Sequence, residues 1–322
     1  MEKSLIMSYI KEIKIGNILC KTNLFLAPMA GITDSPFRIM CLKGGAGLVC
    51  AEMVSANALA FDNKKSQKML TISKEEHPIS MQVFGSEEET IANACKLAEK
   101  QGADIIDINA GCPVKKVNKA GAGAVLMKDL PKLARIVNAA AKSVKIPVTL
   151  KTRIGLTSGN LLACDLVKLA QDNGAAAITL HARYASQMHN GEPDLKALEK
   201  ARAVCKIPLI ANGGAVDAKS VNALFETGAD AVMIGRGAIG NPFLFAELAL
   251  GKGPLTFKEK MALFESLVEQ NVLYYGEKTG VSRTKKVVGF WIKGVNQAAI
   301  LRQKLVLANT LKEFKEILSA VK

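Results

Sequence analysis

One cysteine in this sequence of 322 residues differs from the others in its neighbours. Cys112 stands between a glycine and a proline, which predict a loop, and lysines follow at positions 115, 116 and 119. The other cysteines lie among apolar residues and are typical of small core residues. The loop and the cations favour a functional thiol at Cys112, although one more packing thiol is the alternative.

Two glycine-containing turns could hold a phosphate group. Gly213 and Gly214 follow Asn212, and Gly235 precedes Arg236, in both cases at the end of a short apolar run. Backbone amides at glycine can approach a phosphate closely because glycine has no Cβ, and the start of the next helix adds its dipole. Arg236 would add a charged donor. One such turn is weak evidence, but two adjacent turns predict a phosphorylated cofactor.

Other apolar runs also end in side chains that hydrogen-bond or titrate: Glu52, Gln82, Asn109, Lys151, Arg153, His181 and Arg183. Helix caps would explain one or two of these, but Gln, Lys, His and Arg are not the usual capping residues. Lys151 could place a positive charge next to an electron-accepting ring. No residues have metal-ligand spacing, so we expect no metal, and His189 and Glu52 have no assigned role.

The elements between these residues must bring them together. Eight strand-then-helix units in about 250 residues favour an α/β fold of the (β/α)8 TIM-barrel type over an open sheet. No GxGxxG motif follows the first run, which argues against a dinucleotide-binding fold. The carboxyl ends of barrel strands form the active site in such folds. The β-rich runs are 24–28, 48–53, 79–84, 105–109, 148–152, 177–181, 209–212 and 231–234.

A hairpin and a helical domain are expected outside the barrel. Residues 13–24 alternate around a Gly-Asn turn and are expected to form a hairpin at the barrel floor. The strand pattern ends at about residue 253, which predicts a catalytic domain at 1–253 and an all-helical domain at 254–322. Helices are expected there at 257–275, 285–295 and 311–321.

The composition indicates a globular protein with excess positive charge. Hydrophobic residues make up 49% of the chain, and no apolar run is long enough to span a membrane. The absence of a secretory signal and of a disulfide pattern predicts a reduced, cytoplasmic protein. The net charge of +14 favours a polyanionic partner, although a basic surface that only aids solubility is the alternative. Residues 255–322 are the densest basic part, with 12 Lys and Arg against 6 Asp and Glu.

With these residues the sequence resembles the tRNA-dihydrouridine synthases, most closely their bacterial B-type branch. The resemblance covers about residues 20–250, and the tail matches more loosely through RTKK at 283–286 and WIKG at 291–294. The cysteine motif and the first motif are the most specific. The barrel motifs are APMAGITD at 27–34, MQVFG at 81–85, NAGCPVKKV at 109–117, LKTRIG at 150–155, HAR at 181–183, NGG at 212–214 and MIGRGA at 233–238.

The resemblance implies FMN at the mouth of the barrel. NADPH would reduce the flavin, hydride would pass to C6 of uracil, and Cys112 would protonate C5 from the opposite face. A thiol is mostly protonated at neutral pH and can act as this acid. The residues implied at the flavin and its phosphate are Pro28, Met29, Ala30, Gln82, Lys151, His181, Asn212, Gly213, Gly214, Gly235 and Arg236.

The same resemblance implies tRNA as the partner. We also expect a protein that is monomeric when free and that binds neither membrane nor metal. A uridine of the D-loop must flip out of its stack to reach the barrel. The helical domain is expected to bind tRNA and to contribute little to the cofactor site. The residues expected to contact tRNA or the uridine are Asn109, Lys115, Lys116, Arg153, Arg183, Arg283, Lys285, Lys286 and Lys293.

Three other functions stay open at this point. An FMN-dependent barrel reductase of a free pyrimidine or enone would share the cofactor site but would not need the basic tail. An aldolase-type barrel would use Lys151 as a Schiff-base nucleophile and would be colourless. An RNA-binding protein without catalysis would need neither Cys112 nor the phosphate-binding glycines.

Overall fold

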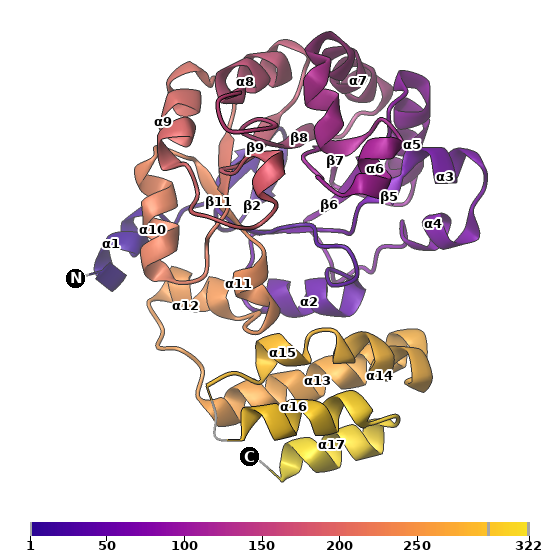
Figure 1. Cartoon of the computed structure of the whole chain (residues 1–322), viewed down its shortest axis with the longest axis vertical. Coiled ribbons are helices and arrows are strands. Elements are labelled where there is room, and N and C mark those ends of the chain that lie inside the picture. Colours follow the sequence, from indigo (N-terminus) through magenta and orange to yellow (C-terminus); the bar gives the residue numbers. More distant parts are fainter. Residues whose placement is uncertain (1, 295–296, 321–322) are drawn as a thin grey trace.

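Eight parallel strands form a closed barrel in the computed structural model, which describes residues 2–294 and 297–320 (Figure 1). Pairing of β11 with β3 and of β4 with β6 closes the ring, and a short strand, β5 (Val54–Ser55), continues along β6. Each strand begins at the residue that the sequence pattern predicted, so the barrel is confirmed. The strands are β3 (Leu24–Leu26), β4 (Leu48–Cys50), β6 (Ile79–Phe84), β7 (Ile105–Ala110), β8 (Val148–Arg153), β9 (Ala177–His181), β10 (Leu209–Asn212) and β11 (Ala231–Ile234).

Helices follow the strands around the outside of the barrel (Figure 1). In α7 the side chain of Asp129 accepts from the N–H of Lys132, a proline occupies the first turn, and the buried apolar residues recur at helical spacing. The helices are α2 (Ser35–Lys43), α3 (Ala56–Ala60), α4 (Lys64–Lys68), α5 (Glu88–Lys100), α6 (Lys115–Lys119), α7 (Leu130–Ser143), α8 (Ala163–Asp172), α9 (Leu195–Val204), α10 (Ala218–Glu226), α11 (Arg236–Ile239) and α12 (Leu244–Leu250), with 3₁₀ turns η1 (Gly123–Lys128) and η2 (Ala185–Gln187).

A hairpin closes the end of the barrel where the strands begin. Strands β1 (Ile13–Ile15) and β2 (Ile18–Cys20) pair antiparallel, and Gly16 has φ +58° in the turn between them. A Cβ at Gly16 would lie 2.6 Å from Pro147 Cγ, so the turn can approach the barrel only with glycine there. Apolar residues of the hairpin form one buried cluster with residues at the strand starts. The hairpin thus fills the barrel floor.

The N-terminal helix α1 (Glu2–Tyr9) was not anticipated from the sequence. It contacts α10 and α12, and the ring of Tyr9 stacks on Phe225 with centroids 5.4 Å apart. Its sequence has only a weak helical pattern, so its position depends on these tertiary contacts rather than on local preference.

A helical part follows the barrel and lies next to α2 and α11 (Figure 1). Its core is aromatic, with Phe264 stacked on Trp291 at 4.8 Å and edge-on to Phe314 at 5.5 Å. The residues between α12 and α13, near 253, are where we propose the domain boundary. The helices are α13 (Phe257–Tyr275), α14 (Glu277–Lys285), α15 (Val288–Trp291), α16 (Ala298–Leu307) and α17 (Leu311–Ser319).

The helices of this part agree with the sequence pattern only in part. The prediction for 257–275 matches α13, and that for 311–321 matches α17 up to residue 319. The predicted helix at 285–295 is wrong, because α14 ends at 285 and only the single turn of α15 follows; residues 295 and 321 lie outside the described part. Among the described residues, no helix combines the length and the apolar character that crossing a membrane requires.

Candidate functional site

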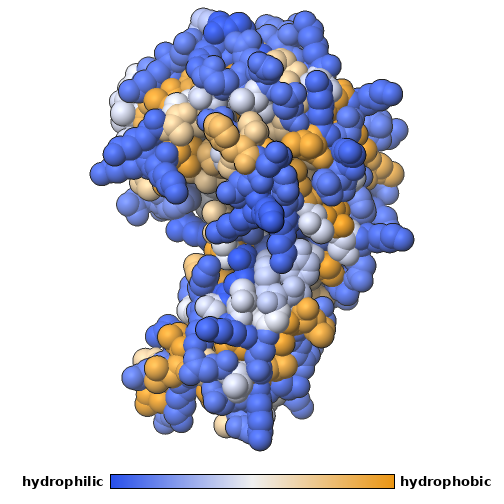
Figure 2. Space-filling view, turned by 90° about the vertical axis from the view of Figure 1, so that its right-hand side faces the viewer, coloured by the Kyte–Doolittle hydropathy of each residue, from blue (hydrophilic) through white to orange (hydrophobic). Residues whose placement is uncertain are grey.

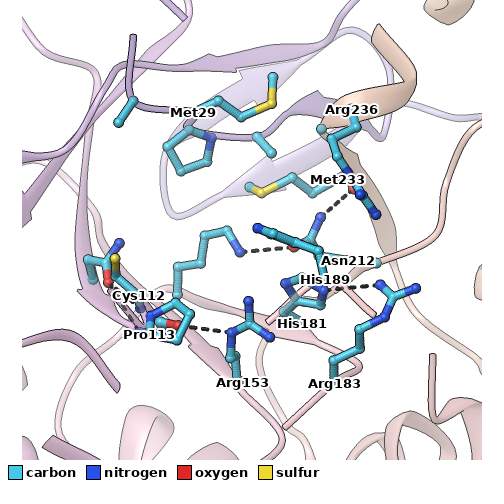
Figure 3. A pocket seen from close by; sticks show the side chains of 18 of the residues that line it. Met29, Cys112, Pro113, Arg153, His181, Arg183, His189, Asn212, Met233 and Arg236 are labelled. Carbon is cyan, nitrogen blue, oxygen red and sulfur yellow. Dashed lines mark hydrogen bonds between the residues drawn. The ribbon is translucent and has the colours of Figure 1, made fainter. Parts of the chain in front are cut away.

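A pocket of about 430 Å³ opens at the carboxyl ends of the barrel strands (Figure 3). All eleven residues expected at a cofactor line it: Pro28, Met29, Ala30, Gln82, Lys151, His181, Asn212, Gly213, Gly214, Gly235 and Arg236. Asn109, Cys112, Arg153 and Arg183 line it as well. Residues from seven barrel strands and the loops after them therefore meet in one place, as the fold requires of an active site.

The glycine turn after β10 has the backbone form that a phosphate site needs. Gly213 has φ +120° and Gly214 has φ +80°, which residues with side chains rarely adopt. A Cβ at Gly213 would lie 3.0 Å from His181 Cδ2, and one at Gly214 would lie 2.8 Å from Pro193 Cγ. The turn can therefore pack this closely against His181 and Pro193 only with glycine at both positions, and its backbone lines the pocket.

The expected contribution of a helix dipole after β10 is not present. Helix α10 begins only at Ala218, and the carboxylate of Asp217 already accepts from the N–H of Ser220. An aspartate cap both satisfies the first turn and repels a phosphate. The donors that remain for a phosphate are the glycine N–H groups of the two turns and the exposed Arg236.

Lys151 belongs to β8 and lines the pocket. Its Nζ donates to Asn212 Oδ1 at 3.0 Å, and Asn212 Nδ2 donates to the carbonyl of Met233 at 2.8 Å. Burial lowers the pKa of Lys151 to about 8, while the negative charge of Asp107 opposes this shift. The amine is therefore held in a fixed place with its charge only partly compensated, which suits a group that stabilises negative charge on a ligand.

His181 lies in a cationic corner of the pocket. Its Nε2 is 3.3 Å from Arg183 NH1, and the ring of His189 is 5.9 Å away. Burial, and then the charges of Lys151 and Arg153, hold the pKa of His181 far below its usual range. The imidazole is therefore neutral and can donate or accept a hydrogen bond. His189, which had no role from sequence, lines the same wall.

Arg153 and Arg183 support loops as well as lining the pocket. Arg153 Nε donates to the carbonyl of Gly111 at 3.0 Å and its NH1 donates to that of Tyr184 at 3.1 Å. Arg183 Nε donates to the carbonyl of Gly191 at 3.0 Å. Part of each guanidinium is thus committed to the protein, and only the remaining N–H groups can reach a ligand.

Cys112 faces the pocket from the side opposite Arg236 (Figure 3). It is partly exposed, whereas five other cysteines are buried and only Cys164 shares its intermediate exposure. Its backbone N–H donates to Asn109 Oδ1 at 3.0 Å, and the carbonyl of Cys112 accepts from Ala124. The thiol is therefore accessible on a loop that is held at both sides. The described residues include no group of His, Cys, Asp and Glu that could hold a metal ion.

Two residues of the site were missed by sequence reasoning. Asp107 lies beneath the pocket and hydrogen-bonds Gln82, which lines it. The sequence could have indicated Asp107, because it stands two residues before Asn109 in β7 and residues two apart on a strand face the same side. Phe290 of the helical part also lines the pocket, the one residue after 253 that does so among the described residues.

Of the basic residues expected at tRNA or the uridine, Arg153 and Arg183 line the pocket, whereas the lysines and Arg283 lie outside it. Lys115 and Lys116 are exposed on α6. Lys286 is exposed and reaches the barrel rim at Gly31. A Cβ atom added to Gly31 would lie 3.6 Å from Lys286 Nζ. Lys293 is exposed above the ring of Phe290, 5.2 Å from its centroid.

Two other basic residues of the helical part are engaged within the protein. Lys285 is half-buried and lies 3.4 Å from Asn309 Oδ1. Arg283 pairs with Asp34 at 2.8 Å and with Glu52 at 3.5 Å. We therefore expect Arg283 to hold the two parts together rather than to contact phosphate directly.

Comparison with known proteins gives one family. Residues 25–322 match the family described as Dihydrouridine synthase (Dus). The tRNA-dihydrouridine synthase B of Vibrio parahaemolyticus is 39% identical over 297 residues, which cover 90% of this chain and 92% of that protein. A probable tRNA-dihydrouridine synthase of Rickettsia conorii is 38% identical, with 94% of both chains covered.

Solved structures support the barrel fold. Morphinone reductase in complex with tetrahydroNAD superposes with a TM-score of 0.55 over 76% of this chain and 91% of its own. The sequence identity is 16%, so this likeness concerns the fold alone.

Proposed function

The chain belongs to the dihydrouridine synthase family and is similar to its B-type members, and on this basis we propose that it reduces the C5=C6 bond of uridine in the D-loop of tRNA. The observation that carries the proposal is the arrangement in the pocket. A partly exposed thiol, Cys112, faces a site built from two glycine turns and a lysine. A flavin reductase of pyrimidines needs these three parts: a proton donor, a phosphate site and a positive charge near the ring.

The pocket fits FMN on the evidence of its own residues. Gly213 and Gly214 leave no room for a Cβ against His181 and Pro193, so their backbone itself lines the pocket, and Arg236 supplies a charged donor. Pro28, Met29 and Ala30 form an apolar edge next to these turns. Bound FMN would supply hydride transfer from NADPH to C6 of the uracil ring. Lys151 would stabilise negative charge at the polar edge of the cofactor.

Cys112 is proposed as the acid that protonates C5. Its loop is fixed by Asn109 from one side and by Arg153, through the carbonyl of Gly111, from the other. A general acid must be held within hydrogen-bond reach of the atom that it protonates, and such an acid contributes about 10²–10⁴-fold to the rate. The supported loop meets that requirement, whereas a packing thiol would not need an open pocket.

The tRNA is proposed to bind across the rim and the helical part. Lys115 and Lys116 lie on the rim after β7, while Lys286 directly follows α14 and Lys293 follows α15. In Figure 2 hydrophilic residues cover much of the visible face, and they are mixed with pale and hydrophobic residues at the narrow region between the two parts. Phosphate contacts of this kind would offset the few kcal/mol needed to flip a uridine out of its stack.

The proposal is tested with purified protein and unmodified tRNA transcript. We expect a yellow protein with about one FMN per chain, which forms dihydrouridine in the transcript when NADPH is present. Mass spectrometry of the digested RNA measures the product. Equal activity on free uridine would instead favour a reductase of free pyrimidines, and a colourless protein would contradict the cofactor.

A further inference from the structure

A chain of hydrogen bonds links a buried carboxylate to the loop that carries Cys112. Asp107 Oδ2 accepts from Gln82 Nε2 at 2.6 Å. Gln82 Oε1 in turn accepts from Asn109 Nδ2 at 2.9 Å. Asn109 Oδ1 then accepts from the backbone N–H groups of Gly111 at 3.1 Å and Cys112 at 3.0 Å. The proposed acid is thus connected to the barrel interior through two amide side chains.

The barrel geometry makes this chain continuous. Gln82, Asp107 and Thr149 are cross-strand partners in β6, β7 and β8, so they lie side by side. Asn109 follows Asp107 by two residues, which places both side chains on the inner face. Thr149 Oγ1 donates to Asp107 Oδ1 at 2.7 Å and so occupies the second carboxylate oxygen. Asp107 is 2% exposed and Gln82 is 1% exposed, so both depend on these partners rather than on solvent.

The carboxylate at one end of this chain and the backbone N–H groups of Gly111 and Cys112 at the other end fix its direction. An ionised carboxylate accepts hydrogen bonds, whereas an amide presents an oxygen on one side and an NH₂ group on the other. Gln82 must therefore turn its NH₂ group to Asp107 and its oxygen to Asn109. Asn109 must then turn its NH₂ group to Gln82, which leaves its oxygen for the N–H of Cys112.

We infer that Asp107 is a positioning residue, which acts through Gln82 and Asn109 to hold the Cys112 loop and to fix which amide atoms face the pocket. This inference rests on the proposed function, because it assigns Asp107 to the step that uses Cys112. A neutral amide at position 107 removes one of the two groups that fix the orientation of Gln82 and Asn109, so both amide side chains can turn over more readily. The N–H of Cys112 would then face an NH₂ group and lose its acceptor, at a site where such a loss is unfavourable.

The ionised carboxylate of Asp107 is unfavourable in the folded protein. Burial raises the pKa of its carboxyl to about 6, while the hydrogen bonds from Thr149 and Gln82 and the charge of Lys151 oppose the shift. The titratable groups that face it are Lys151 from β8 and Cys50 from β4. A raised pKa means that the folded protein disfavours the ionised form. Perturbed pKa values of this kind cluster at functional sites, which agrees with the position of Asp107 beneath the pocket.

The first test compares Asp107→Asn with Thr149→Val. The control removes one hydrogen bond to the same carboxylate but leaves its charge and both amides in place. We expect Asp107→Asn to slow oxidation of the reduced, FMN-loaded protein by unmodified tRNA by about tenfold or more, while reduction by NADPH stays within about twofold. Thr149→Val should stay within about twofold in both steps.

Two measurements on flavin-free protein separate positioning from loss of structure. In Asp107→Asn the N–H groups of Gly111 and Cys112 should exchange faster with deuterium, while the melting temperature equals or exceeds that of the wild type. A tRNA-dependent rate equal to the wild type would overturn the inference. A slower rate with unchanged exchange at Gly111 and Cys112 would also overturn it.

A compensating pair of substitutions gives an independent test. In Asn109→Asp the new carboxylate accepts from the N–H of Cys112, but it competes with Asp107 for the single NH₂ group of Gln82. Adding Asp107→Asn gives every group of the chain a hydrogen-bond partner again. Gln82 can then donate to the carboxylate at position 109 and accept from the amide at position 107. The double variant should therefore turn over faster than Asn109→Asp alone.

A double variant slower than Asn109→Asp alone would refute the role of Asp107. The outcome is separate from that of the proposed function, because it is read only if the wild-type protein forms dihydrouridine. A wild type that reduces no tRNA would refute the proposed function itself.

Discussion

Arg283 Nε in α14 donates to Asp34 Oδ2 at 2.8 Å, and this ion pair joins the helical part to the loop after β3. Arg283 also lies 3.5 Å from Glu52 Oε2, and the other oxygen of Glu52 accepts from the backbone N–H of Gly31. The same loop carries residues 28–30, which we propose at the flavin. The ion pair therefore braces one edge of the cofactor pocket from the helical side.

Arg283→Met is predicted to loosen this edge. Asp34 is 6% exposed, and removing its cation leaves a poorly compensated carboxylate. The stability of the FMN-free protein should fall by about 1–3 kcal/mol, and FMN should dissociate more readily. Thermal unfolding and flavin content after dialysis measure these effects. Adding Asp34→Asn should recover part of the stability. Normal stability with a weaker salt dependence of tRNA binding would show that Arg283 contacts phosphate instead.

Lys286 and Lys293 are predicted to contact tRNA phosphates. Both are exposed next to the barrel rim, unlike Lys285, which is half-buried and near Asn309. Replacing Lys286 and Lys293 with serine should lower the affinity for tRNA and reduce its salt slope by about one unit for each phosphate that is no longer neutralised. Flavin content and oxidation of NADPH should stay near normal. Lys258→Ser, which removes an exposed lysine of α13, is the matched control. If the wild type, the double variant and Lys258→Ser show the same salt dependence of tRNA affinity, the tRNA binds at another surface.

Arg236→Ala is predicted to weaken the hold on FMN. Since the cap at Asp217 excludes a contribution from α10, Arg236 and the glycine N–H groups are the donors that remain. Charge-assisted hydrogen bonds to an anion contribute about 1.5–3 kcal/mol, so retention should fall by about one to two orders of magnitude. The flavin content of protein purified under equal conditions measures it. If Arg236→Ala retains FMN as well as the wild type, the phosphate of FMN does not bind at this turn.

Lys151→Met is predicted to change the stability of the flavin-free protein with pH. The folded-state pKa is lowered to about 8 from 10.5, so the unfolded chain binds the proton more tightly. The charged amine thus destabilises the folded state below pH 8, and this effect disappears as pH rises towards 10.5. The free energy of unfolding of Lys151→Met should exceed that of the wild type by about 1–3 kcal/mol at pH 7. This difference should become smaller above pH 8. A stability difference that becomes larger with rising pH would contradict the lowered pKa of Lys151.

The barrel could be predicted from the sequence because its strands are buried on both faces. Such strands appear as short, continuous apolar runs that begin after glycine-containing helix ends, as in β9 and β11. The polar residues at the carboxyl ends of these runs then converge by topology alone. This explains why the pocket residues were found together.

The remaining features depend on contacts that the sequence does not show. Helix α1 is positioned by Tyr9 against Phe225, far along the chain. The role of Arg283 depends on Asp34 and Glu52, which belong to the other part of the protein. Motif reasoning treated this arginine only as a charge, because no local pattern indicates an ion pair over such a separation.

The central claim is that this protein reduces uridine in tRNA with Cys112 as the acid. The most direct test is a single turnover in which NADPH-reduced protein is mixed with unmodified tRNA, and dihydrouridine and flavin oxidation are followed together. We predict that Cys112→Ala is reduced normally but forms dihydrouridine about 10²–10⁴-fold more slowly, while Cys164→Ala, the other partly exposed cysteine, matches the wild type. A wild-type protein that forms no dihydrouridine, or a Cys112→Ala protein as fast as the wild type, would contradict the claim.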